Sequence, residues 1–305
     1  MKKHLLKRLL PKRLLPSSLI LLLGPVGLTG CTTVRLVQQV QAPEVYRTAS
    51  VEQLEKEVSD RDAALKTLKA SVVITASVGG GKTGKVTEYT SFKGYIYVQK
   101  PRDLRVLLQV PVFGSRAMDM VSNGETFTLM RASTHGDIWM QGSNTVTTPS
   151  KNGLENLRPP VFFDSLLVPG VKPEEYVALN ESTRVIQPQI KNHPAIAEPD
   201  YDLAVMKKKA GNILQTERVI HISRVTMLPI EQDIYDEGGQ IVTVATYDKY
   251  QDFNGQKFPT VINISRPIDQ YSLKIEVTKL ELNETLDPDQ FVLEIPEGVT
   301  VQKMP

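Results

Sequence analysis

Residues 94–114 read GYIYVQKPRDLRVLLQVPVFG, and this stretch decides the fold class. Ile96 and Val98 recur at every second position before a Lys-Pro turn, and Leu104 and Val106 recur in the same way after it. Alternation with a period of two is typical of a strand that buries one face. The stretch therefore predicts two strands joined by a short turn.

The same period extends over most of the chain. Turn signals such as Asn123-Gly124 and Asn254-Gly255 separate the apolar segments, and Asn-Gly is the strongest short hairpin signal. No segment alternates strand with helix in the way that a parallel sheet requires. Strands are predicted at 71–78, 87–99, 103–110, 116–122, 125–132, 136–141, 176–180, 183–187, 200–207, 212–225, 228–236, 240–251, 257–267, 271–283 and 291–295.

Two segments favour helix. Ser50 and Gln53 have the spacing of a capping box, and apolar residues then recur at helical intervals, which predicts a helix over 51–69. Residues 149–175 hold five prolines and two apolar runs, which indicate a loop with a short second helix. We expect a mainly β (α+β) fold, in which one strongly curved antiparallel sheet carries both helices on its concave face. Residues 187–199 are predicted to be a loop within a single domain.

The N-terminus indicates export. Residues 1–30 hold six basic residues and no acid, followed by an apolar run that is short for a membrane span. Leu28, Thr29 and Gly30 precede Cys31, the single cysteine, and this pattern resembles a bacterial lipobox. The resemblance implies cleavage before Cys31 and acylation of that residue. We therefore expect a lipoprotein signal peptide at 1–30, a lipidated cysteine with a tether at 31–49, and one domain at 50–305.

Composition excludes several function classes. After the first 30 residues the chain carries 34 acidic and 30 basic residues, so it lacks the basic surface of a nucleic-acid-binding protein. One cysteine excludes an internal disulfide framework. A glycine-rich stretch at 76–83 fits a relaxed phosphate-loop pattern, but strand-like residues follow where a helix is needed, which favours a hairpin and no nucleotide.

No catalytic or metal-ligand motif stands out in the sequence. His135, His193 and His221 lack the spacing of known metal motifs, and His221 alternates with isoleucines as a half-buried strand residue would. We therefore predict no catalytic residue, no metal site and no cofactor, and a protein that is not an enzyme.

Several motifs, in order, resemble the LolA/LolB-type superfamily of envelope lipoprotein carriers and receptors. After the lipobox and the first helix come KASVVITASV (69–78), residues 94–114 and VSNGETFTLM (121–130), and YDKYQDFNGQKFP (247–259) and DPDQFVLEIPEG (287–298) follow near the end. The resemblance covers roughly residues 50–300. It implies an unclosed half-barrel with the helices as a lid over an apolar cavity for acyl chains, although this chain is longer, with added residues around 149–199.

Apolar strand residues are the candidates for lining such a cavity, and packing as an ordinary core is the alternative interpretation. These candidates are Ile74, Ile96, Val98, Val106, Leu108, Met118, Met120, Phe127, Ile262 and Ile264. The receptor also carries an exposed apolar residue on the loop between its third and fourth strands. Val112 and Phe113 occupy the corresponding turn here, where they either pack onto the helix or contact a membrane or partner.

Two functions remain open. The first is a lipoprotein, anchored by its N-terminal acyl groups in the inner leaflet of the outer membrane and facing the periplasm, that binds acyl chains of lipids or lipoproteins. Thr32 after the cysteine favours the outer membrane over the inner one. The second is a structural or assembly lipoprotein that uses the half-barrel to dock envelope proteins, which a concavity filled by side chains would favour.

Overall fold

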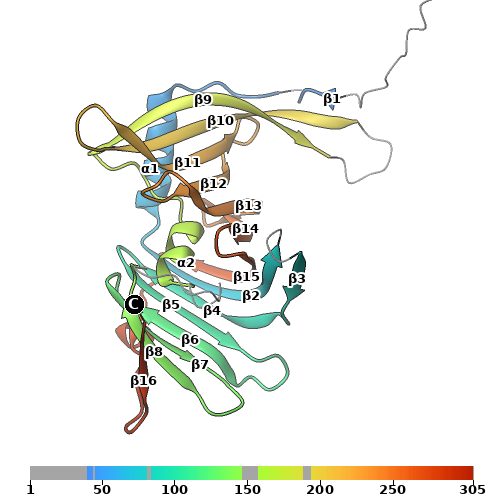
Figure 1. The fold of residues 1–305 in the computed structure, drawn as a ribbon. Helices are drawn as coiled ribbons and strands as arrows, with labels where there is room; N and C mark the ends of the chain where they lie inside the picture. Colours follow the sequence, from blue (N-terminus) through green and yellow to red (C-terminus); the bar gives the residue numbers. More distant parts are fainter. Residues whose placement is uncertain (1–39, 44, 81–83, 146–156, 188–193, 305) are drawn as a thin grey trace, which may run out of the picture. The chain divides into compact units, whose positions relative to one another are not determined.

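A computed structural model of the chain describes residues 40–43, 45–80, 84–145, 157–187 and 194–304. Residues Gln39–Pro305 form one compact unit. Within the described ranges, sixteen strands join in one sheet that curves strongly and does not close (Figure 1). The fold class predicted from the period-two pattern is confirmed.

Two antiparallel meanders build the sheet. The first runs through β2 (Thr67–Gly80), β4 (Phe92–Gln99), β5 (Asp103–Gln109), β6 (Arg116–Ser122), β7 (Thr126–Arg131) and β8 (Ile138–Ser143), with β3 (Lys85–Glu88) beside the end of β2. The second runs through β9 (Glu175–Ile186), β10 (Ala195–Lys208), β11 (Leu214–Ser223), β12 (Pro229–Tyr235), β13 (Ile241–Phe253), β14 (Gln256–Arg266) and β15 (Tyr271–Leu282).

Antiparallel pairing of β15 with β2 joins the two meanders, from Leu282 opposite Leu68 to Tyr271 opposite Val78. Two short strands pair in parallel near the ends of the sheet: β1 (Val40–Gln41) with β10, and β16 (Val301–Met304) with β8.

Helix α1 (Val51–Ala64) begins with the predicted capping box, in which Ser50 and Gln53 each accept a hydrogen bond from the other's backbone N–H. Leu54 and Val58 are buried on β9, β10 and β11, where Tyr201, Leu203 and Ile220 surround them. Helix α2 (Pro159–Leu166) lies in the bend of the sheet, and Val161, Phe162 and Leu166 enter the main core (Figure 1).

Several boundaries differ from those predicted. Helix α1 ends at Ala64 and not at residue 69, because Leu65 is extended and Leu68 pairs with Val98 and Leu282 in the sheet. The two predicted strands at 176–180 and 183–187 are one strand, β9, and the predicted loop at 187–199 contains the start of β10. The predicted strand at 291–295 is wrong, because residues Pro288–Phe291 form a 3-10 helix and no strand follows before β16.

No helix in the described part of the chain is long and apolar enough to cross a membrane.

Candidate ligand pocket

The residues predicted to line a cavity form the main core. Ile96, Val106 and Met120 lie in one row across β4, β5 and β6, and each is 0% exposed. Phe127, Ile262 and Ile264 are buried in the same cluster, and so are Ile74, Val98 and Leu108, whereas Met118 packs against it while partly buried. None of the ten lines the pocket described below. A cavity-lining role for them stays a prediction.

Val112 and Phe113 form an apolar tip on the turn between β5 and β6. Their side chains are 97% and 83% exposed, so neither packs onto a helix. Val112 has a φ of 76°, which is rare for a β-branched residue. The turn is held by two backbone hydrogen bonds, from Val110 N–H to the Ser115 carbonyl and from Gly114 N–H to the Val110 carbonyl. The structure thus holds two adjacent apolar side chains in solvent.

The lipobox residues Leu28, Thr29 and Gly30, and Cys31, lie outside the residues that the structure describes. Part of the glycine-rich stretch, residues 81–83, also lies outside them, but β2 and β3 on either side pair antiparallel, as the hairpin interpretation requires.

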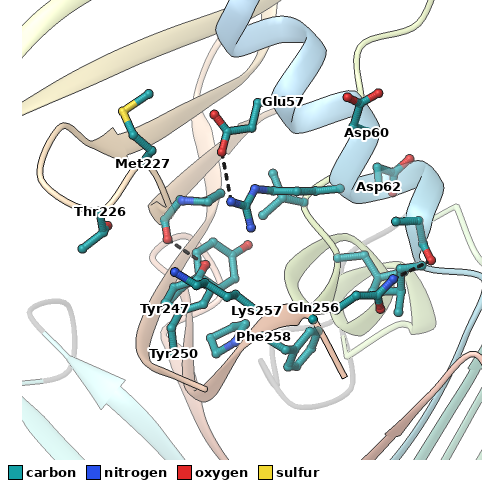
Figure 2. Close-up of a pocket in the computed structure, with 18 of the residues that line it drawn as sticks. Glu57, Asp60, Asp62, Thr226, Met227, Tyr247, Tyr250, Gln256, Lys257 and Phe258 are labelled. Carbon is teal, nitrogen blue, oxygen red and sulfur yellow. Dashed lines mark hydrogen bonds and ion pairs between the residues drawn. The ribbon is translucent and has the colours of Figure 1, made fainter. Parts of the chain in front are cut away.

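A pocket of about 620 Å³ lies between α1 and the β13–β14 hairpin. Figure 2 shows Glu57, Asp60 and Asp62 of α1 on one side, and Tyr250 and Phe258 of the hairpin on the other. This volume is within the range of about 300–1,000 Å³ of small-molecule sites. Its apolar walls consist of Leu65, Leu166, Leu167, Val168, Met227, Pro229, Tyr247, Tyr250, Phe258, Pro259 and Leu282.

The same helix supplies charged groups to the pocket. Arg61 donates to Glu57 at 3.0 Å, Lys56 pairs with Asp60, and Asp62 pairs with Lys100. One face of α1 therefore packs in the core through Leu54 and Val58, while the next face presents paired charges to the pocket.

Arg47 and Lys257 add two further cations to the lining. No ion pair joins either side chain to another described residue. The lining therefore contains two cations, Arg47 and Lys257, that no carboxylate among the described residues pairs with.

Two tyrosines give the apolar wall a polar element. The Tyr250 hydroxyl donates to the Pro229 carbonyl at 2.7 Å. The Tyr247 hydroxyl is buried, yet it has no hydrogen-bond partner among the described residues. Burial raises the pKa of both side chains above their ordinary value, so both remain neutral donors. A buried hydroxyl without a partner costs about 1–3 kcal/mol, and a ligand that accepts its proton would recover part of that cost.

Asp164 lies on α2, close enough to Tyr247 for the two groups to interact electrostatically. Burial raises the pKa of its carboxyl group to about 6, against a smaller opposing effect of the Arg218 and Lys172 charges. The Asp164 backbone carbonyl accepts a hydrogen bond from Gln232 on β12, which ties α2 to the sheet.

This raised pKa has a consequence for stability. The folded protein keeps a proton on Asp164 between pH 3.8 and about 6, where the unfolded chain has lost it. The contribution of this group to stability therefore falls as pH rises through that window, by up to about 3 kcal/mol. Asp164→Asn removes this component, so its free energy of unfolding should exceed that of the wild type at pH 7 and approach it near pH 4.

Denaturant unfolding at the two pH values measures the difference, and Asp137→Asn, an exposed carboxyl on the β7–β8 turn, is the control. An equal pH dependence in Asp164→Asn and the wild type would show that Asp164 is not desolvated.

Sequence reasoning missed the pocket because its walls come from five separate segments. The segment YDKYQDFNGQKFP at 247–259 carries a local signal, but in the sequence alone it indicates only a hairpin and the family resemblance. Tyr247, Tyr250, Phe258 and Pro259 of this segment form one wall of the pocket, but only the pairing of β13 with β14 and the position of α1 bring them into one site.

No protein-family model matches the sequence, and a search of curated proteins found no match. Solved structures similar to this chain include a DUF1329 family protein from Desulfovibrio piger, at 16% identity and a TM-score of 0.49, covering 79% of this chain and 95% of that one. A LolA superfamily protein from Nitrosomonas europaea is 9% identical with a TM-score of 0.47, covering 79% of this chain and 97% of that one. An outer membrane lipoprotein-sorting protein domain from Vibrio parahaemolyticus is 9% identical with a TM-score of 0.44, with the same two coverages.

The open, curved sheet with helices on its inner face is the mainly β architecture that the sequence predicts. At 9–16% identity and TM-scores below 0.5, the similar structures say nothing about which ligand this chain binds.

Proposed function

We propose that this chain is a lipid-anchored envelope protein that binds acyl chains non-covalently in the pocket between α1 and the β13–β14 hairpin. The observation that carries the proposal is the pocket itself, whose walls are mainly apolar and whose charged groups gather along one helix. An acyl chain would occupy the apolar part, and its ester or carboxyl group would meet the Tyr247 hydroxyl or the cations of the lining. No reaction on the ligand is proposed.

The driving force is apolar burial, worth ~25 cal/mol per Å² removed from water. Met227 is one of the wall residues, and its flexible thioether adapts to chains of different length. In the proposed binding mode the strands of the first meander, β2 and β4–β8, support the sheet and do not contact the ligand.

Ala64 offers a direct test, because it lines the pocket while being exposed and is therefore tolerant of a larger side chain. Ala64→Trp should fill the pocket and weaken binding of a dansyl-labelled fatty acid roughly tenfold or more, equivalent to ~1.4 kcal/mol, as measured by fluorescence titration. Ala63→Trp is the matched control, since Ala63 is also exposed on the last turn of α1 but does not line the pocket.

Equal affinity of Ala64→Trp and Ala63→Trp for the probe would show that the probe binds outside this pocket. Failure of the wild type to bind the probe would reject acyl binding by this pocket.

The anchor is part of the same proposal and rests on the lipobox-like sequence at 28–31. Two or three acyl chains on one residue give stable membrane attachment, because each buried CH₂ contributes ~0.8 kcal/mol. The domain would then face the periplasm from the inner leaflet of the outer membrane.

Cys31→Ala should abolish incorporation of radiolabelled palmitate and release the protein from the membrane fraction. The chain contains no other cysteine that could accept the label through sulfur. Labelling that persists in Cys31→Ala would contradict the lipobox assignment.

A docking module is the second candidate function, and two observations favour it. The row formed by Ile96, Val106 and Met120 is fully buried in the main core, as expected if side chains fill the concavity. The exposed tip of Val112 and Phe113 offers an apolar contact to a membrane or a protein, and its strained backbone at Val112 is typical of a functional turn.

Photo-crosslinking separates the two candidates. With p-benzoylphenylalanine in place of Phe113, a carrier or receptor should crosslink to lipid or to an acylated protein in cells, whereas a docking module should crosslink to one protein without lipid. The same group in place of Val86, which is 58% exposed on β3, is the control and should give neither product. Absence of any product specific to position 113 would show that the tip makes no contact.

A further inference from the structure

A group of acidic side chains and one histidine lies on the face of the second meander that α1 does not cover. Leu203, Ile220 and Ile222 point toward α1, so the alternate residues on the same strands point outward. Asp202 on β10 lies opposite His221 on β11, and His221 lies opposite Glu231 on β12. Three neighbouring strands therefore bring an imidazole and two carboxylates into one row across the sheet.

The fourth member of the group is Asp233, which lies two residues after Glu231 on β12. One ligand atom each of His221, Glu231 and Asp233 lies within 4.8 Å of the others. The three residues are partly buried, and the His221 and Asp233 side chains are 22% and 14% exposed. Such spacing allows all three to reach a single ion.

The orientation of His221 is fixed by Asp202. His221 Nδ1 lies 2.7 Å from Asp202 Oδ1, and the Ser182 hydroxyl donates to the same oxygen at 2.9 Å. A carboxylate that accepts from one imidazole nitrogen directs the other nitrogen toward a metal and raises its basicity. The other nitrogen, Nε2, is buried without a hydrogen bond among the described residues, and Asp233 Oδ2 lies 3.5 Å from it.

Negative charge is in excess at this place. The Glu231 carboxylate is partly buried and has no ion pair or hydrogen bond with another described residue. Burial raises its pKa, against the opposing charge of His221 and with a smaller contribution from the Asp233 charge. Asp200, two residues before Asp202, is 3% exposed, and its Oδ1 has no partner among the described residues. Arg184 pairs with Asp200 and Glu198, and its charge also acts on Glu231 without forming an ion pair with it.

We propose that His221 Nε2 and the carboxylates of Glu231 and Asp233 bind a divalent transition-metal ion of the zinc class, with Asp202 as the positioning residue. One imidazole and two carboxylates suit zinc better than magnesium or calcium, which prefer oxygen ligands alone. Three protein ligands leave a coordination position open to water or an anion. The ion would connect β11 to β12 and stabilise the folded state by mass action.

A proton is the competing occupant of this site. Asp233 and Asp202 together raise the pKa of His221 to about 9, because an imidazolium ion between them offsets part of their charge. A metal ion must displace that proton, so its binding is a measurable competition.

The test uses the full chain, purified without a polyhistidine tag and stripped with a chelator. Titration with Zn²⁺ in a calorimeter should show one saturable site per chain, and Co²⁺ should give a visible absorption band from an imidazole-bound ion. His221→Ala and Glu231→Gln should each weaken Zn²⁺ binding roughly tenfold or more, and Asp202→Asn should weaken it by roughly 10–100-fold.

His135→Ala is the matched control, because His135 is exposed on the β7–β8 turn and should leave the affinity unchanged. Glu231→Gln keeps the test decisive if His221→Ala does not fold, since the Glu231 carboxylate has no partner to lose. Absence of saturable Zn²⁺ binding, or equal affinity in Glu231→Gln and the wild type, would overturn the proposal and leave His221 as a proton-bearing ion-pair residue.

Discussion

The pairing of β15 with β2 joins the two meanders into one continuous sheet. It runs from Leu282–Leu68 to Tyr271–Val78 and joins strands that are some 200 positions apart in the sequence. Without it each meander would keep an additional unpaired edge, which invites pairing with other chains. With it, the buried residues of β2 have a neighbouring strand on each side: Ala70 is paired with Ile96 on β4 and with Leu280 on β15.

The position of the pocket follows from that continuous sheet. Because α1 leads directly into β2 through Leu65 and Lys66, the helix is held over the second meander, and its last turn comes close to the β13–β14 hairpin. Hydrogen bonds from Gln256 and Asn283 to the Ala64 carbonyl fix this end of the helix. The segment before the helix is held as well, since the Arg224 guanidinium donates to the Arg47 carbonyl and lies over the rings of Tyr46 and Tyr201. Both ends of the lid over the pocket are thus tied to the sheet.

The sheet and the first helix could be predicted because their signals are local. Alternation in residues 94–114 and the capping box at Ser50 each depend on a few adjacent positions. The end of α1 could not be predicted, because Leu65 and Leu68 continue the helical spacing of apolar residues. Pairing of Leu68 in the sheet overrides that spacing. Strand β16 could not be predicted either, because its four residues form a strand only by pairing with the edge of β8, beginning at Trp139.

The two candidate sites needed the tertiary structure. Tyr247 and Ala64 are distant in the sequence, and their common pocket depends on the helix position. His221, Glu231 and Asp233 match no metal motif, because the strand register and not the sequence spacing brings them together. Conversely, the apolar strand residues that the family resemblance suggested as cavity walls are those that the sheet packs most completely, as Ile96 and Val106 show.

Native mass spectrometry of the protein released from its own membrane distinguishes acyl binding from protein docking, since it weighs any molecule that remains bound. Acyl binding predicts a complex with a lipid or fatty acid that dissociates on collisional activation and whose chains are identified in the extract. A single mass corresponding to the acylated chain alone, with no lipid in the extract beyond the covalent anchor, would contradict acyl binding and favour the docking function.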